Sequence, residues 1–268
     1  MLEWTPTNNK EVLTTVIESE CTVLHITDCH LFEDTKVVKN GVNPFASLGA
    51  VLTAACAAKT PDVVVASGDI AHDPVPTTYR VFCDLVRSFH EGPFLVVPGN
   101  HDIWDSMQPI FELHPVEFSS WTIVPLDTHV EGLVSGEVSY ETILWLRECL
   151  ERTKENVIVV GHHPLVDIGV AWLDAHQVQN ATDVLSILQM HQNVQAYICG
   201  HVHLESSKQH NRLKLWTTPS TCWQFANDID TFALSPLTPG WRWLELHADG
   251  TIDTRVERLS ESQVAGIS

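Results

Sequence analysis

Carboxylate, amide and imidazole side chains recur in short motifs, each placed directly after an apolar run of the chain. They give seven candidate metal ligands: Asp28, His30, Asp69, Asn100, His162, His201 and His203. Such oxygen and nitrogen donors bind Mn, Fe, Zn or Co, and the lack of thiolates disfavours a structural zinc site. Seven groups are too many for one ion of this kind but suit two ions that share a bridging carboxylate.

The spacing within the motifs predicts how they reach an ion. Asp28 and His30 are two residues apart, as are His201 and His203, and we expect extended backbone at both pairs. In extended backbone, residues i and i+2 face the same side, so both members can reach one ion. Each motif alone is weak evidence, because Gly-Asp is more often a turn and a lone Asp-x-His is common. Together, each after a predicted strand, they indicate a two-metal site.

The elements that must position these motifs alternate between strands and helices. The predicted strands are Cys21–Thr27, Asp62–Ser67, Phe94–Val97, Trp121–Asp127, Val157–Val160 and Val194–Cys199. The predicted helices are Pro44–Lys59, Pro76–His90, Ser139–Arg152 and Ala181–His191. This alternation is typical of an α/β fold, in which ligands bind beyond the carboxyl ends of the strands. We therefore expect the motifs to converge on one crevice.

The last part of the chain has a different character. After Leu213 it is rich in Trp and turn residues, and Asp249-Gly250 predicts a hairpin between the apolar runs Trp241–His247 and Ile252–Leu259. No internal repeat or long linker interrupts the sequence. We predict a single domain over residues 1–268, with the metal motifs in about 22–204 and a β-rich completion in about 213–259.

Composition limits the class of function. Acidic residues outnumber basic residues by 34 to 15, a formal net charge of −19, so we expect no diffuse basic surface for nucleic acid or anionic membranes. An anionic substrate would need local positive charge, which two divalent metal ions supply. The seven cysteines form no C-x-x-C pair, and residues 1–20 lack the apolar region of a signal peptide. These features predict reduced thiols and a cytoplasmic location.

The motifs resemble the blocks of the calcineurin-like metallophosphoesterases over about residues 22–204. Within that superfamily the chain is most similar to the bacterial class III cyclic-nucleotide phosphodiesterases, which act on 3′,5′-cyclic AMP. The segments that carry the narrower resemblance are Ile26–Phe32, Pro98–Asp102, His162–Leu165, Cys199–His203, Pro219–Phe225 and Pro239–Thr251. The resemblance implies the calcineurin-like metallophosphoesterase fold of the α/β class, a four-layer αββα sandwich with a dinuclear site at its top.

The resemblance also implies roles for the individual residues. One metal would be held by Asp28, His30, Asp69 and His203, and the other by Asn100, His162 and His201, with Asp69 as the bridge. His162 is preferred to His163 because the family's ligand lies two residues before the proline. His101 resembles the family's substrate-facing histidine, and Asp102 is a candidate to orient it. His72 and Asp73 are expected to form hydrogen bonds around the site instead of binding a metal.

The predicted reaction is hydrolysis of cyclic AMP to 5′-AMP by a hydroxide that bridges two metals, Fe and/or Mn. The catalytic group would comprise His101, Asn100 and Asp69, and the residues expected to contact substrate are His30, Asp69, Asn100, His101, His162 and His203. A homodimer is allowed, and the region of Trp172, Asn180 and Trp223 is a candidate border of the nucleotide. Two alternatives stay open: a broader phosphoesterase acting on 2′,3′-cyclic nucleotides, glycerophosphodiesters or phosphomonoesters, and a non-catalytic scaffold of the same fold.

Overall fold

The computed structural model describes residues 19–118, 120–265 and 267. Its first sheet has the strand order β13-β12-β1-β2-β3. The bounds are β1 Ser19–Ile26, β2 Val63–Ala66, β3 Phe94–Val96, β12 Gly240–His247 and β13 Ile252–Arg258. Strands β1, β2 and β3 are parallel, whereas β12 runs antiparallel to β1 and to β13. The carboxyl ends of the three parallel strands therefore meet at one edge of this sheet.

The second sheet has the order β4-β5-β6-β7-β9-β8. The bounds are β4 Val116–Glu117, β5 Trp121–Pro125, β6 Asn156–Val160, β7 Val194–Cys199, β8 Ser206–His210 and β9 Leu213–Thr217. Strands β5, β6, β7 and β9 are parallel, and β4 and β8 form antiparallel edges. A separate two-stranded ribbon pairs β10 Gln224–Phe225 with β11 Leu234–Ser235.

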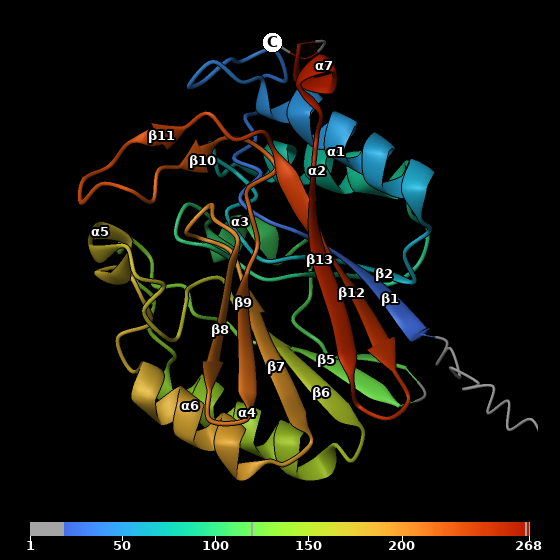
Figure 1. Ribbon diagram of the computed structural model, residues 1–268, viewed down its shortest axis with the longest axis vertical. Helices are drawn as coiled ribbons and strands as arrows, with labels where there is room; N and C mark the ends of the chain where they lie inside the picture. Colours follow the sequence, from blue (N-terminus) through green and yellow to red (C-terminus); the bar gives the residue numbers. More distant parts are fainter. Residues whose placement is uncertain (1–18, 119, 266, 268) are drawn as a thin grey trace, which may run out of the picture.

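Helices cover the outer face of each sheet (Figure 1). α1 Pro44–Ala58 and α2 Pro76–Arg87 lie against the first sheet, and α4 Tyr140–Arg152 and α6 Ala181–Met190 lie against the second. Three short helices complete the described part of the chain: α3 Trp104–Met107, α5 Ala171–Asp174 and α7 Glu261–Val264. α1 begins where the sequence predicts, because Pro44 occupies its first turn and the Asn43 side chain accepts a hydrogen bond from the Ala46 amide.

The central strands of the two sheets are apolar on both faces because both faces are buried. In β1, Val23 faces the second sheet, where it packs in one cluster with Ile158 and Ile198. Its neighbour Leu24 faces the other way and packs in the cluster that contains Leu48 of α1. This period-two alternation between two apolar environments explains the continuous Val-rich runs of the sequence. Helix, sheet, sheet and helix form four layers, so the predicted αββα sandwich is confirmed.

The structure confirms each long predicted element to within three residues at either end, and the Asp249-Gly250 hairpin joins β12 to β13. The hairpin of β8 and β9 is missing from the predictions. β8 is a largely polar edge strand, so its sequence carries no apolar alternation. The prediction for residues 1–20 falls almost wholly outside the described residues. Within the described part of the chain, no helix has the length and apolar character needed to cross a membrane.

Candidate active site

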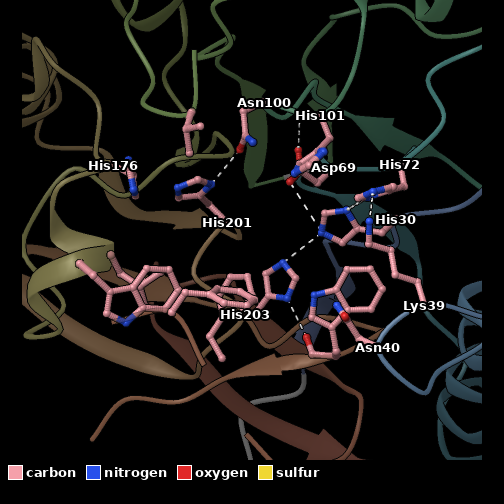
Figure 2. Close-up of a pocket in the computed structure, with 16 residues that line it drawn as sticks. His30, Lys39, Asn40, Asp69, His72, Asn100, His101, His176, His201 and His203 are labelled. Atoms are coloured by element: carbon pink, nitrogen blue, oxygen red, sulfur yellow. Dashed lines mark hydrogen bonds and ion pairs between the residues drawn. The ribbon is translucent and has the colours of Figure 1, made fainter. Parts of the chain in front are cut away.

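The loops after the parallel strands of both sheets bring the seven candidate ligands together. Asp28 and His30 follow β1, Asp69 follows β2, and Asn100 follows β3. From the second sheet, His162 follows β6, and His201 and His203 follow β7. Figure 2 shows Asp69, Asn100, His30, His201 and His203 around one cavity. The seven groups come from five separate loops, so only the folded arrangement of both sheets assembles them.

One half of the site consists of Asp28, His30 and His203, whose ligand atoms all lie within 4.8 Å of one another. The Nε2 atoms of His30 and His203 are 3.1 Å apart, and the Oδ1 atom of Asp28 is 3.3 Å from Nε2 of His203. Asp69 adjoins this group, because its Oδ2 atom is 3.8 Å from Nε2 of His30.

The other half consists of Asn100, His162 and His201. The Asn100 Oδ1 atom is 3.2 Å from Nε2 of His162 and 2.9 Å from Nδ1 of His201. The Oδ1 atom of Asp69 lies 3.4 Å from Nε2 of His162. One oxygen of Asp69 thus faces each half, which is the placement that a carboxylate shared by two ions requires.

Backbone carbonyls orient two of the imidazoles. The Nδ1 atom of His203 donates to the Trp223 carbonyl at 2.6 Å, and Nδ1 of His162 donates to the Ser67 carbonyl at 2.7 Å. In the neutral ring, each Nε2 atom then carries a lone pair that points into the site. The Nε2 atom of His201 is buried and has no hydrogen-bond partner among the described residues. Facing lone pairs beside two buried carboxylates fit a pair of cations, so the residues present suit two bound metal ions.

His163 is close to the site but is held by other groups. Its Nδ1 atom lies 2.8 Å from Thr128 Oγ1, and its Nε2 atom lies 3.2 Å from the Val134 carbonyl. Both ring nitrogens are thus occupied within the protein, although His163 lies near His162 and His201. These contacts leave His162 freer than His163 to bind a metal, and the assignment of His162 as the ligand stays a prediction.

The backbone at the ligands differs from the expected extended conformation. Asp28 and His30 have φ angles of 52° and 49°, and His201 and His203 have φ angles of 66° and 48°. β1 and β7 end before these residues, and the chain turns in the left-handed region instead. The prediction of extended backbone was therefore wrong, although both members of each pair do face the same site.

Burial sets the protonation of the site in the absence of cations. Burial lowers the pKa of His30 and of His201 well below the usual histidine value, so both rings are neutral, as metal ligands must be. His162 differs: burial lowers its pKa, but the Asp69 carboxylate beside it outweighs this effect and raises the pKa to about 9. In return, although burial raises the pKa of Asp69, the neighbouring His162 brings it well below the usual range. Asp69 is therefore an anion whether or not cations are bound.

His101 lies at the open side of the site, where its ring stacks on His72 with centroids 5.0 Å apart. Its backbone amide donates to Asp69 Oδ1 at 2.8 Å, which fixes the loop while the exposed ring stays free to meet a substrate. The sequence suggested that Asp102 orients the His101 ring, but the structure gives Asp102 other partners. Its carboxylate instead accepts hydrogen bonds from the backbone amides of Gly99, Ile70 and Ala71 and from the Tyr79 hydroxyl, so it holds the loops after β2 and β3 together.

His72 borders the site from the side of the first sheet. Its Nδ1 atom is 3.5 Å from Nδ1 of His30, and its Nε2 atom is 2.7 Å from the Lys39 ammonium. Burial and the Lys39 charge lower the pKa of His72 to about 4, so the neutral ring accepts a hydrogen bond from Lys39. Asp73 is held through its backbone amide, which donates to the Leu31 carbonyl. Lys39 was missed, because no pattern around it in the sequence distinguishes it from a surface lysine.

A pocket of about 240 Å³ opens over these groups. Of the predicted substrate contacts, His30, Asp69, Asn100, His101 and His203 line it, whereas His162 is fully buried and does not. Trp172 and Trp223 also line it, but Asn180 instead hydrogen-bonds the backbone of Val138. His176, which has no motif context and was expected to be a surface or structural residue, lines the pocket as well (Figure 2).

The site can be compared with known proteins. The family model of the calcineurin-like phosphoesterases matches residues 21–205, which include every motif described above. The chain belongs to the calcineurin-like phosphoesterase family. It is 36% identical over 256 residues to the 3′,5′-cyclic adenosine monophosphate phosphodiesterase of Escherichia coli K12, covering 92% of each chain. A phosphodiesterase of the same description from Haemophilus influenzae is 34% identical, over 90% of this chain and 91% of that protein.

Solved structures agree on the architecture. A dimetal phosphatase from Danio rerio superposes with a TM-score of 0.64, covering 91% of this chain and all of that one. The two sequences are 16% identical, so this likeness concerns the fold alone. Family membership and the clusters of His and Asp together indicate a site for two metal ions in this member of the family.

Proposed function

We propose that the protein hydrolyses 3′,5′-cyclic AMP to 5′-AMP at a dinuclear metal site. The proposal is carried by the extent of the similarity to cyclic AMP phosphodiesterases, which covers 92% of this chain, whereas the general phosphoesterase model ends at residue 205. The shared segment therefore extends well beyond the metal motifs, into the part of the chain that forms β12 and β13. Similarity restricted to the motifs would have supported only a phosphoesterase of undefined substrate.

Asp28, His30, Asp69 and His203 would hold one ion, and Asn100, His162 and His201 would hold the other, with Asp69 shared between them. The donors of oxygen and imidazole nitrogen suit Mn, Fe, Zn or Co, and the resemblance to the family points to Fe and/or Mn among these. Bound ions of this kind polarise phosphoryl oxygens and acidify water, which provides a nucleophile at neutral pH. They also give the anionic substrate a positive surface in a chain whose formal net charge is −19.

The remaining chemistry belongs to the protein side chains. Asn100 and the histidines fix the phosphodiester next to His101 at the mouth of the pocket. The attacking water gives up one proton to the solvent. As its oxygen bonds to phosphorus, the bond from phosphorus to the ribose O3′ breaks and its electron pair stays on O3′. A ring N–H of His101 then delivers a proton to O3′ and completes the leaving hydroxyl. A cytoplasmic location and a homodimer remain predictions from the sequence.

The test is a steady-state comparison of substrates with the purified protein supplied with Mn²⁺ or Fe²⁺ in separate preparations. Cyclic AMP, cyclic GMP, 2′,3′-cyclic AMP and p-nitrophenyl phosphate are compared by kcat/KM, and we expect cyclic AMP to lead. A preference for p-nitrophenyl phosphate or for 2′,3′-cyclic AMP would contradict the proposal and favour a broader phosphoesterase. A folded protein that binds fewer than two ions and cleaves none of the four would instead be a scaffold.

The variant Asn100→Ala tests the site itself. Because the Asn100 amide oxygen lies within 3.2 Å of ring nitrogens of both His162 and His201, its loss opens one half of the site. We expect kcat to fall by at least about 100-fold while the far-ultraviolet circular dichroism stays unchanged. Normal turnover in the folded variant would show that Asn100 is not part of the site.

A further inference from the structure

The pocket is lined by two chemically different groups of residues. One group consists of the metal-ligand groups with Lys39, where the Trp223 ring stacks on His30, and the other consists of three aromatic side chains, Trp172, Phe225 and Phe232. Their ring centroids are mutually close: Trp172 lies 5.3 Å from Phe225 and 5.8 Å from Phe232, and the two phenylalanines are 5.5 Å apart. The three residues come from α5, β10 and the loop before β11, and we call them the aromatic cleft.

The aromatic cleft adjoins the metal site directly. The Phe225 ring stacks on the imidazole of His203, with centroids 4.0 Å apart and planes inclined by 15°. Figure 2 shows His203 in the middle of the pocket, between the groups around His30 and those around His176 and His201. A phosphate held by the ligand groups would therefore have the cleft beside it.

The cleft is not a closed part of the core. Phe232 is 61% exposed, and the Trp172 side chain is only partly buried. A structural aromatic cluster would remove these rings from water, since each exposes a large apolar surface. An open aromatic surface of this kind fits a flat ring that stacks on it.

We propose that the aromatic cleft is the nucleobase subsite, in which the purine ring of a nucleotide stacks while its phosphate lies on the metal ligands. This inference rests on the proposed function, and it names the part of the protein that distinguishes a nucleotide from other phosphodiesters. Stacking on aromatic side chains is a general means of holding bases, because every base has a π-face.

The polarity of the pocket sets the direction of the nucleotide. Lys39 and the ligand groups lie together at the end that suits an anionic phosphate. The aromatic end has no ammonium or guanidinium group among its lining residues, so the reverse orientation would place the phosphate against apolar rings. The base therefore occupies the cleft, and the scissile bond faces His101.

The experiment compares cyclic AMP with a substrate that lacks the base, 1-deoxyribose 3′,5′-cyclic phosphate, on the metal-loaded full chain. Trp172→Ala and Phe232→Ala remove stacking surface, Trp172→Phe keeps a smaller aromatic ring, and Tyr140→Ala is the matched control. Tyr140 is an aromatic residue, 70% exposed, on α4 and outside the pocket. Phe225 is left unchanged because its ring supports His203.

We expect Trp172→Ala and Phe232→Ala to raise KM for cyclic AMP about 10-fold or more, with kcat changed by less than about 3-fold. Trp172→Phe should lie between wild type and Trp172→Ala. KM for the base-free substrate should be the same in all four variants and in wild type. An equal rise in KM for both substrates, or no rise in KM for cyclic AMP, would overturn the proposed subsite.

A binding measurement separates this inference from the proposed function. The affinities of 5′-AMP and ribose 5-phosphate are measured by calorimetry on the metal-loaded wild type and on Trp172→Ala. We expect the preference for 5′-AMP to fall about 10-fold in the variant. If wild type cleaves cyclic AMP but Trp172→Ala keeps this preference, the subsite is wrong and the function stands. If wild type cleaves no cyclic nucleotide, the function is wrong, and the preference for 5′-AMP decides the subsite alone.

Discussion

Strained backbone marks the residues that carry the chemistry. Asp28, His30, Asp69, His201 and His203 all have φ angles between 48° and 66°. Left-handed backbone costs a non-glycine residue on the order of 1 kcal/mol, and it persists only where the surroundings enforce it. Here the backbone amide of Asp28 donates to the Gly68 carbonyl and that of His30 to the Asp69 carbonyl. Hydrogen bonds between loops thus hold the ligands in position without help from the ions.

Lys39 should act on substrate binding through its charge. Its ammonium group lies 2.7 Å from His72, and Lys39 is the one lysine or arginine among the described residues that line the pocket. We expect Lys39→Gln to raise KM for cyclic AMP about 3- to 10-fold and to weaken the dependence of kcat/KM on ionic strength. Steady-state kinetics at low and high salt measure both effects.

The matched control for this prediction is Lys36→Gln. Lys36 belongs to the same loop, is exposed and does not line the pocket. Lys36→Gln changes the net charge of the chain by the same amount as Lys39→Gln, so an effect of net charge alone would appear in both variants. Equal effects of the two substitutions would contradict a specific role for Lys39.

At the scale of elements, the sequence predicted the strands and long helices but not the course of the loops between them. Buried runs such as β6 and the hairpin of β12 and β13 have strong local signals. The left-handed turns at Asp28 and His201 have none, because hydrogen bonds to other loops enforce them. The same limit applies to Trp172 and Phe232, since their proximity depends on how α5 and the loop before β11 meet. The ligand types were readable in the sequence, whereas these contacts were not.

The turn after β7 requires a residue without a side chain. A Cβ atom at Gly200 would overlap Thr27 Oγ1 and the Asp28 carboxylate. We expect Gly200→Ala to displace the loop that carries His201 and His203, lowering kcat by more than 10-fold and stability by about 1–3 kcal/mol. Gly49→Ala is the control, because Gly49 lies in α1 with open space around its Cα, and alanine there should stabilise the helix by about 0.5–1 kcal/mol. Similar urea midpoints for the two variants would refute the close-approach argument.

A buried histidine beneath the site links β1 to the loops that follow β2 and β9. His25 Nε2 lies 2.7 Å from Ser67 Oγ, and its Nδ1 lies 2.7 Å from Thr218 Oγ1. Burial, assisted by the charge of Arg242, lowers the pKa of His25 from 6.5 to about 3. Between these two values the unfolded chain binds the extra proton, so stability falls as the pH drops below 6.5, by up to about 1.4 kcal/mol per unit.

His25→Gln should remove this contribution to the pH dependence. With a chelator present, the difference in unfolding free energy between pH 7 and pH 5 should shrink by about 2 kcal/mol relative to wild type. Urea denaturation at the two pH values measures it. His114→Gln serves as the control, because the His114 side chain is 76% exposed and should leave the difference unchanged. An unchanged difference in His25→Gln would show that this ring is not the group that titrates.

At the scale of the whole molecule, the candidate metal centre joins the two sheets. The first sheet contributes Asp28, His30, Asp69 and Asn100, and the second contributes His162, His201 and His203. Each half of the site draws on both sheets, because His203 completes the group around His30 and Asp69 lies beside His162. Bound ions would therefore tie the two halves of the sandwich together at the edge where the strands end.

Removal of metal should consequently weaken the whole sandwich. A ligand present at about 100 times its Kd stabilises the folded state by about 2.7 kcal/mol, so we expect chelation to lower Tm by several degrees and Mn²⁺ to restore it. Hydrogen exchange should quicken most in the five ligand loops from both sheets, since apolar packing between the sheets remains. In Asn100→Ala the fall in Tm on chelation should be smaller, because one half of the site is incomplete. Equal Tm values with and without chelator, in a protein shown to contain two ions, would mean that the centre does not join the sheets.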